Sequence, residues 1–268
     1  MNTPLKRRNF LGYLATVFAL SRCKVDVIKP STVSNSGQTP PPTPPLVTNE
    51  YLAQYGITEM GNDMVPEDPK FNQSINGYTD QISYNPGDTV TVHLSGPPSS
   101  NSVIPLLDTR GNTILSISTP ITTQKIKSNK PWVDGFMYDK TFSYKIPANF
   151  KSGIYTWLGT IPFVCKAPDQ SADITVVYPS NTTNAYNFAG GKSLYAPDTK
   201  NRATVLSFLR SQTISYIEFY KWVDKLSYTI NYVADSDLDN YIAIENSKIV
   251  IITGHSEYWT RTARLNMD

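Results

Sequence analysis

A short apolar strand, Ile174 to Tyr178, runs directly into a polar stretch, Asn181 to Tyr195, that reads NTTNAYNFAGGKSLY. The strand alternates too weakly to be a solvated edge, which indicates a buried strand of a parallel sheet. A second strand, Lys248 to Ile252, runs into the sequence GHSEYW at Gly254 to Trp259. If the two strands are parallel, both polar segments lie at the carboxyl edge of one sheet, where open α/β sheets bind ligands.

The rest of this C-terminal part alternates helix and strand, as α/β folds do. The spacing predicts a helix over Tyr216 to Leu226 and a strand over Thr229 to Val233. Five residues of the helix recur with its period and should form one buried stripe, so its tyrosines are expected in the core: Tyr216, Phe219, Tyr220, Val223 and Leu226. Asp235 to Asp239 lacks the glycine and the distal glutamate of a calcium loop. A capped loop that leads into a short helix is the favoured interpretation there.

The preceding segment, about residues 71–166, carries short strands separated by turns. The expected strands include Thr89 to Leu94, Thr113 to Ile117, Lys140 to Ile146 and Gly153 to Trp157. Alternation in the first of these places Val90, Val92 and Leu94 on one face and His93 on the other, towards solvent or an interface. Cys165 is predicted to be a plain buried strand residue. Short strands at this spacing indicate an immunoglobulin-like β-sandwich.

Together these patterns predict a multidomain α+β protein. The immunoglobulin-like sandwich would occupy residues 71–166, after a connecting segment at 51–70. An incomplete α/β domain with a parallel sheet, flavodoxin-like or amidotransferase-like, would occupy residues 167–268. The net charge of +2, with both signs interspersed, leaves no broad field of one sign, so nucleic acid is not implied as a partner. The 17 tyrosines suit extracellular β-domains, sugar binding and phenolate ligation alike.

The N-terminal sequence is typical of an exported bacterial protein. Lys6-Arg7-Arg8 precedes an apolar run, Phe10 to Leu20, which is too short to span a bilayer permanently. The arginine pair fits a twin-arginine signal or the basic region of a general secretory signal. Cys23 follows as a candidate lipid attachment site, although Arg22 stands where a lipobox has a small residue. Residues 24–50, rich in Pro, Ser and Thr, predict an extended tether. We therefore expect a periplasmic or cell-surface protein, attached to the membrane through the signal or a lipid at Cys23.

Three short motifs in this order, AYN, GGKSLY and GHSEYW, resemble the C-terminal domain of the N,N-dimethylformamidase large (beta) subunit and its secreted bacterial relatives. The resemblance covers about Ser171 to Thr260. It implies a mononuclear iron held by two tyrosinates and one glutamate, and the matching positions are Tyr186, Tyr195 and Glu257. His255 matches a histidine beside these ligands, so His255 and Glu257 are the catalytic candidates. Asn187 and Trp259 are the candidates for substrate contact.

The implied chemistry is hydrolysis of an amide C–N bond. Iron held by oxygen ligands acts as a Lewis acid, polarises the amide carbonyl and lowers the pKa of water. The chain departs from the family at Ser207-Phe208, which leads to Leu209-Arg210-Ser211 instead of an Arg-Pro pair. In the family the domain also continues beyond GHSEYW and supplies further acid/base and amide groups. We therefore expect residues 167–268 to form the N-terminal part of such a domain.

Other interpretations of these residues stay open. Tyr186 and Tyr195 could be loop aromatics that pack the two domains together, and Glu257 could cap the turn after its strand. Gly190-Gly191 indicates a tight turn or a close backbone approach. Ser256 is one residue short of a nucleophile elbow, but an α/β-hydrolase needs a histidine downstream of its serine, and none follows. The alternative function is a non-catalytic surface lipoprotein with a ligand-binding sandwich and crevice.

Overall fold

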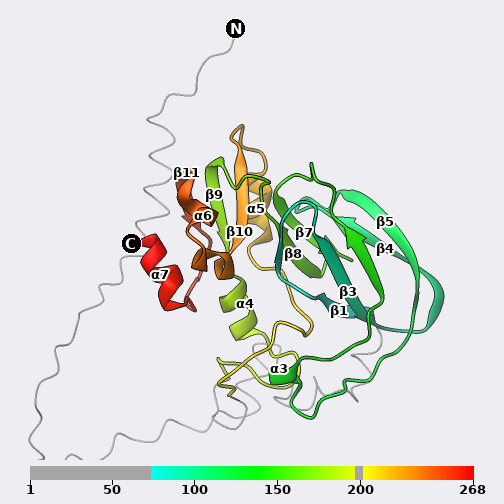
Figure 1. Ribbon diagram of the computed structural model, residues 1–268. Helices are drawn as coiled ribbons and strands as arrows, with labels where there is room; N and C mark the ends of the chain where they lie inside the picture. The colour runs from blue at the N-terminus through cyan, green and yellow to red at the C-terminus, as the bar shows by residue number, and fades with distance from the viewer. Residues whose placement is uncertain (1–73, 197–201) are drawn as a thin grey trace, which may run out of the picture. The chain divides into compact units, whose positions relative to one another are not determined.

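Three β-sheets and five helices make up the part of the chain that the computed structural model describes, residues 74–196 and 202–268 (Figure 1). The protein is therefore a mixed α+β protein in which strands predominate. The predicted signal, Cys23, the tether and the connecting segment lie outside the described residues. Among the helices that are described, none has the length and apolar character needed to cross a membrane.

Two of the sheets share one apolar core. The smaller sheet has the order β1-β3-β6, and its strands are β1 (Asn76–Thr79), β3 (Thr89–Ser95) and β6 (Phe142–Lys145). The larger sheet has the order β2-β8-β7-β4-β5, and its strands are β2 (Ser83–Tyr84), β4 (Ser99–Leu107), β5 (Thr113–Ile121), β7 (Gly153–Trp157) and β8 (Ile161–Cys165). Neighbouring strands are antiparallel except β2 and β8.

The alternation predicted for β3 is confirmed. Val90, Val92 and Leu94 are at most 1% exposed and pack with buried residues of the larger sheet such as Trp157. His93 lies on the other face, but it is not directed to open solvent. Its ring stacks on Tyr78, and its Nδ1 lies 2.8 Å from the backbone oxygen of Tyr138. Cys165 is buried in β8, as predicted.

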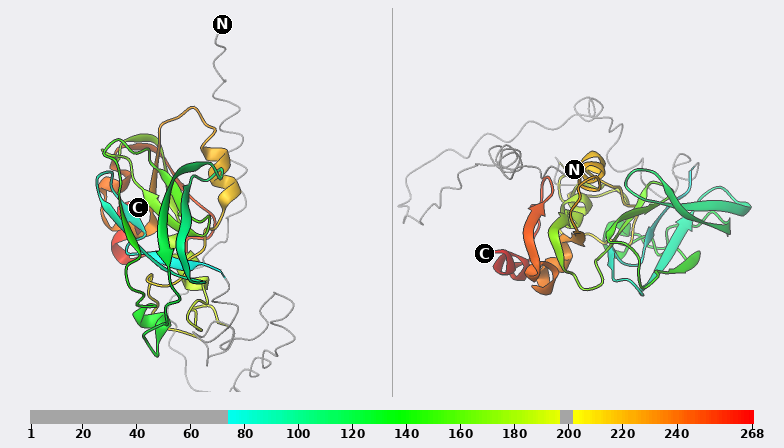
Figure 2. Two further views of the ribbon diagram at one scale, coloured as in Figure 1. Left: turned by 90° about the vertical axis from the view of Figure 1, so that its right-hand side faces the viewer. Right: turned by 90° about the horizontal axis from the view of Figure 1, so that it is seen from above.

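The third sheet is parallel and has the order β10-β9-β11. Its strands are β9 (Ala172–Tyr178), β10 (Ile230–Ala234) and β11 (Ser247–Ile252). In this register Val177 lies opposite Ile252, so the strands before the two polar motifs end at the same edge. Figure 2 shows β11 (orange) at the outer edge of this sheet, with the C-terminal helix (red) beside it.

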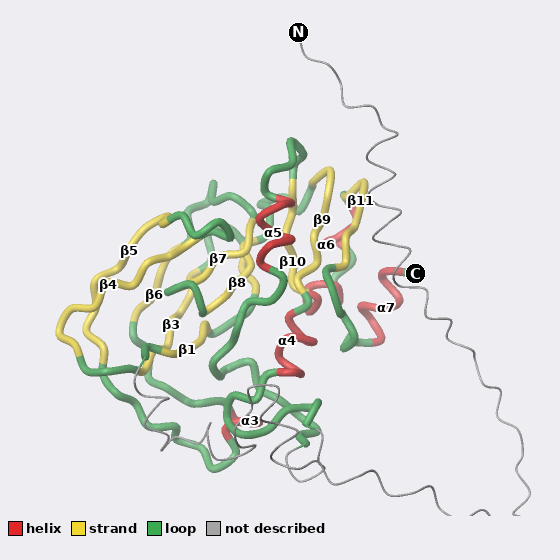
Figure 3. Tube along the Cα trace, turned by 180° about the vertical axis from the view of Figure 1, so that it is seen from behind, coloured by secondary structure: helices red, strands yellow, loops and turns green. Residues whose placement is uncertain are grey.

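Helices cover both faces of the parallel sheet (Figures 1 and 3). On one face, buried side chains of α5 (Ile217–Val223) pack on β9 and β10, together with Ile154 and Val164 of the larger antiparallel sheet. The other face packs against the 3₁₀-helix η1 (Asp235–Asp239), α6 (Ile242–Glu245) and α7 (Arg261–Met267). The remaining helices are α3 (Pro131–Asp134) and α4 (Ser180–Tyr186).

Two local predictions need correction. The stripe predicted for the helix over 216–226 loses its first member, because Tyr216 precedes α5 with φ 59° and is 40% exposed. A residue with positive φ cannot continue a right-handed helix, so its side chain leaves the stripe, whereas Tyr220 and Val223 are buried as predicted. A capped loop that leads into a short helix was predicted at Asp235 to Asp239; these residues form the 3₁₀-helix η1 instead of a loop, and the short helix α6 follows them.

Candidate functional site

The first polar segment begins as a helix. Directly after β9, the chain forms α4, which ends at Tyr186. Gly190 and Gly191 follow with φ 86° and 93°, values that glycine adopts without strain. At Gly190 an added Cβ would lie 3.0 Å from the backbone nitrogen of Trp132, so the glycine also permits a close approach to α3. The turn returns the chain so that Tyr195 meets Tyr186.

The two tyrosines and Glu257 form one cluster. The rings of Tyr186 and Tyr195 stack with their centroids 3.8 Å apart and an angle of 19° between their planes. The Tyr195 hydroxyl donates to Oε2 of Glu257 at 2.5 Å, and the Tyr186 hydroxyl lies 3.4 Å from both carboxylate oxygens. Tyr195 and Tyr186 are 62 and 71 positions from Glu257 in the chain, yet their two phenol oxygens lie beside the two oxygens of its carboxylate.

The cluster is open to solvent on the side of His255. Nδ1 of His255 lies 3.6 Å from Oε1 of Glu257, and the imidazole side chain is 77% exposed. Both tyrosines are 42% exposed. The hydrogen bond to Glu257, followed by that to Tyr186, raises the pKa of Tyr195 well above its ordinary value. The phenol oxygen of Tyr195 therefore carries its proton, which faces the carboxylate.

Side chains of α4 fix the turn that carries Glu257. The hydroxyl of Thr182, which is 4% exposed, accepts the backbone N–H of Glu257 at 2.8 Å. The side-chain amide of Asn181 donates to the backbone oxygen of Tyr258 at 2.8 Å. Because residues 254–258 lie outside any helix or strand, their backbone groups depend on such side-chain partners. Helix α4 thus positions Tyr186 directly and Glu257 through these two hydrogen bonds.

The start of α4 is tied to a buried carboxylate. Asp235, 1% exposed, accepts the hydroxyl of Ser180 and the backbone N–H of Asn181, the latter at 3.0 Å. Burial raises the pKa of Asp235 to about 6, although these hydrogen bonds act in the opposite direction. Asp235 follows β10, so this contact joins α4 to the neighbouring strand.

A buried arginine, which the sequence analysis noted only as a departure, organises the segment between the two tyrosines. Arg210 is fully buried, and its guanidinium donates to backbone oxygens on both sides of the turn and to one side-chain oxygen. The backbone oxygens are those of Asn184, Asn187, Ala189, Lys192 and Ser207, and the side-chain oxygen is Oδ1 of Asn184. Burial lowers the pKa of its guanidinium to about 10, which still leaves the group charged near neutral pH. In the sequence, Arg210 is a lone arginine in a segment of Ser, Leu and Gln, and this pattern gives no indication of its structural role.

A groove of about 390 Å³ adjoins the cluster. Hydroxyl, amide, phenol and imidazole side chains line it: Thr182, Thr183, Tyr186, Asn187, Thr213, Ser215, Tyr216 and His255. Asn187 is on this wall, but its amide group donates to Ser211 and accepts from Ala189. Trp259 does not line the groove. It packs beside the apolar cluster of α6, α7 and β9, and its Nε1 donates to Ser256 at 2.6 Å.

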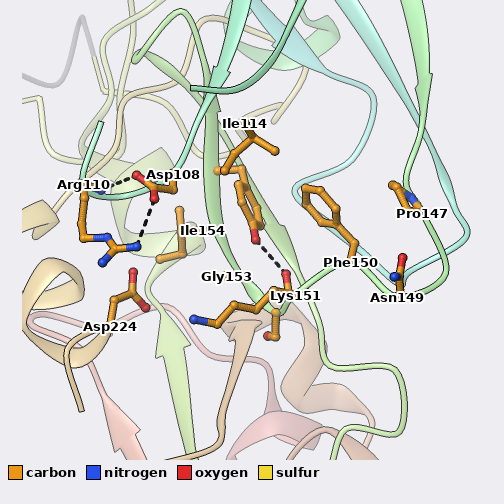
Figure 4. Close-up of a pocket in the computed structure, with 12 residues that line it drawn as sticks. Asp108, Arg110, Ile114, Pro147, Asn149, Phe150, Lys151, Gly153, Ile154 and Asp224 are labelled. Carbon is orange, nitrogen blue, oxygen red and sulfur yellow. Dashed lines mark hydrogen bonds and ion pairs between the residues drawn. The ribbon is translucent and has the colours of Figure 1, made fainter. Parts of the chain in front are cut away.

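Figure 4 shows a second hollow, of about 340 Å³, near the start of β7 and the end of α5. Most of its polar groups have partners within the protein. Arg110 pairs with Asp108 at 3.6 Å, and Asp224 accepts the hydroxyls of Thr109 and Tyr232. This hollow contains none of the motif residues, so the tyrosine–glutamate cluster and its groove are the better candidate site.

The donor set of the cluster fits a hard metal ion. Two phenol oxygens and one carboxylate converge within hydrogen-bonding distance, and oxygen donors of this kind suit iron. Three negative charges would arise when both phenols lose their protons, which matches a trivalent ion. Within residues 74–196 and 202–268, no group of three or more His, Cys, Asp or Glu offers a competing metal site.

The family model described as N,N-dimethylformamidase beta subunit-like, C-terminal, matches residues 110–268. The match starts well before the motifs at the ends of β9 and β11, and it includes strands of the larger antiparallel sheet. A comparison with curated proteins finds no match.

Proposed function

The chain belongs to the N,N-dimethylformamidase beta subunit-like family, and from this premise we propose that it is an iron-dependent hydrolase of amide C–N bonds. The observation that carries the proposal is the convergence of Tyr186, Tyr195 and Glu257 from two strand ends. These three residues would hold the iron. When bound, the iron would supply Lewis-acid chemistry that polarises an amide carbonyl and activates water.

The chain's own residues prepare this centre in three ways. The stacked rings of Tyr186 and Tyr195 restrict the positions of their two phenol oxygens. Glu257 accepts the Tyr195 hydroxyl, so these two residues would hold a cation at this point only after the hydroxyl gives up its proton. His255 is exposed and lies beside the carboxylate, where its imidazole could take up a proton and orient Glu257.

The adjoining groove fits a small polar substrate. Its lining offers hydroxyl and amide groups, and the exposed edge of Tyr186 borders both the groove and the cluster. A soluble amide or formamide could therefore reach the cluster from the groove with its polar groups solvated by Thr and Ser side chains. Asn187 would form part of the groove wall beside the substrate. Trp259, which does not line the groove, would act through its packing within the protein.

The experiment is release of amine from dimethylformamide by the full chain loaded with iron. We expect release by the unaltered protein and its loss in Glu257→Gln, which keeps the size of the side chain but removes the charge. Tyr241→Phe is the matched control, because Tyr241 is 52% exposed and lies at the start of α6, outside the cluster. If the protein binds iron but the Glu257→Gln variant releases amine equally well, the proposal is wrong. If it neither binds iron nor releases amine, the non-catalytic surface protein is the better account.

Three further assignments accompany this proposal. The common core of the two antiparallel sheets supports an immunoglobulin-like sandwich. The parallel order β10-β9-β11, with helices on both faces, supports a flavodoxin-like or amidotransferase-like α/β domain. The basic and apolar N-terminal sequence supports export to the periplasm or the cell surface, with Cys23 as the lipid attachment site.

A further inference from the structure

We propose that Tyr216 is a positioning residue: it fixes the Gly254–Glu257 turn from the α5 side and thereby directs the Glu257 carboxylate towards Tyr186 and Tyr195. The proposal stands on contacts within the protein. It rests on the proposed function only for the consequence that iron affinity depends on Tyr216.

The first contact is a hydrogen bond. The backbone N–H of His255 donates to the hydroxyl of Tyr216 at 3.1 Å. The two anchors from α4 hold the backbone of Glu257 and Tyr258, so Tyr216 supplies a third anchor at the start of the turn. Three side chains from two sides therefore hold three backbone groups within four residues.

The second contact is between a ring and a glycine. A Cβ added to Gly254 would lie 2.1 Å from Cζ of Tyr216 and 2.5 Å from Cε1, so the Tyr216 ring lies directly against the glycine backbone. Gly254 also has φ 56°, in the left-handed region. Two separate constraints therefore favour glycine at position 254, namely the left-handed backbone conformation and the close approach of the Tyr216 ring.

Tyr216 occupies an unfavourable backbone conformation to make these contacts. Its φ of 59° and ψ of 30° are left-handed values, which bulky residues rarely adopt and which Gly or Asn tolerate better. Tyr216 is 40% exposed, so burial in the core does not explain why a tyrosine occupies this position. Strained residues of this kind cluster at functional sites. Tyr216 also lines the groove together with His255 and Tyr186, which places it beside the cluster.

Two substitutions separate the contacts. Tyr216→Phe keeps the ring and removes the hydroxyl that accepts from His255. Tyr216→Asn removes the ring and suits the left-handed backbone. The first measurement is hydrogen exchange of the peptide that covers residues 254–259 in the metal-free protein. We expect faster exchange in Tyr216→Phe and still faster exchange in Tyr216→Asn, while the melting temperature of Tyr216→Asn is unchanged or higher.

The second measurement is the iron dissociation constant, which should rise roughly tenfold in either variant, as for other residues that orient metal ligands. A merely structural role would lower the melting temperature and leave the affinity of the folded protein alone. Tyr241→Phe should change neither exchange nor affinity. Exchange and affinity both within about twofold of the unaltered protein in Tyr216→Phe and Tyr216→Asn would overturn the proposal.

A double substitution tests the ring contact by itself. Gly254→Ala should speed exchange of the turn, because its Cβ collides with the ring and its backbone becomes strained. In the Tyr216→Asn background the collision is absent, so the added effect of Gly254→Ala should be smaller. Strictly additive effects would contradict the ring–glycine contact. If the unaltered protein binds no iron, the proposed function fails, but hydrogen exchange still decides the role of Tyr216.

Discussion

The hydroxyl of Thr182 accepts the backbone N–H of Glu257 at 2.8 Å, which joins the helix that ends at Tyr186 to the turn that carries the carboxylate. The two residues are 75 positions apart in the chain. The contact is buried on the Thr182 side, so water does not readily replace the hydroxyl. The distance between Tyr186 and Glu257 therefore depends on this hydrogen bond as well as on the sheet.

Thr182→Val should weaken iron binding as well as the fold. The substitution keeps the shape of the side chain and leaves the Glu257 N–H without its acceptor, which should cost about 1 kcal/mol of unfolding free energy. Because the carboxylate loses its restraint, we expect the iron dissociation constant to rise several-fold in a titration. Thr156→Val, at a buried position of β7, is the matched control. Equal effects of the two substitutions on iron binding would argue against the role assigned to Thr182.

Arg210→Lys should destabilise the protein although it conserves the charge. A guanidinium presents several N–H groups in a fixed plane, whereas an ammonium cannot reach the same spread of carbonyl oxygens. Leaving several of the backbone oxygens around Asn184 to Lys192 unpaired should cost roughly 2–4 kcal/mol in denaturant unfolding. Arg264→Lys on the surface of α7, 69% exposed, should change stability by less than about 0.5 kcal/mol. A small loss in Arg210→Lys would show that the segment between the tyrosines holds its shape without these bonds.

Asp235 should make stability fall as the pH rises through the mildly acidic range. Its pKa rises from an ordinary value of 3.8 to about 6 in the folded protein, so the fold favours the protonated form. The contribution of protonated Asp235 to the free energy of unfolding is fully present below about pH 4. It is lost as the pH rises through about 6, a change of roughly 2–3 kcal/mol. Asp235→Asn has no such proton to lose. The difference in unfolding free energy between the two proteins, measured from pH 4 to 7, should therefore follow this sign, and a difference that is independent of pH would contradict it.

The sequence could predict most of the strands, though not β1, β2 or β4, and the meeting of the two motifs. Regular alternation marked Val90, Val92 and Leu94 as core, and the apolar run before Asn181 marked a buried strand. Once β9 and β11 are parallel neighbours, the edge where both motifs emerge is determined by the register. The shared edge brings the two polar segments together, and the family resemblance singles out Tyr186, Tyr195 and Glu257 within them.

The supports of the cluster could not be predicted, because each depends on a contact between distant segments. Tyr216 fits the period of the helix that follows it, and only its backbone angle removes it from the buried stripe. Arg210 binds backbone oxygens, which leave no trace in the sequence of the residues that carry them. The polar stretch from Asn181 gave no indication of a helix, since Asn and Thr are weak helix formers, but hydrogen bonds to Asp235 and to the turn at 254–258 support α4 there.

The most direct test of the central claim is a titration of the metal-free protein with ferric iron, followed by visible absorption. Tyrosinate bound to ferric iron absorbs visible light by charge transfer. We expect a band that saturates at one iron per chain, weakens in Tyr186→Phe and in Tyr195→Phe, disappears when both are replaced, and is unchanged in Tyr241→Phe. A colourless protein that nevertheless binds iron stoichiometrically, or a band that survives the double substitution, would show that these two tyrosines do not hold the metal.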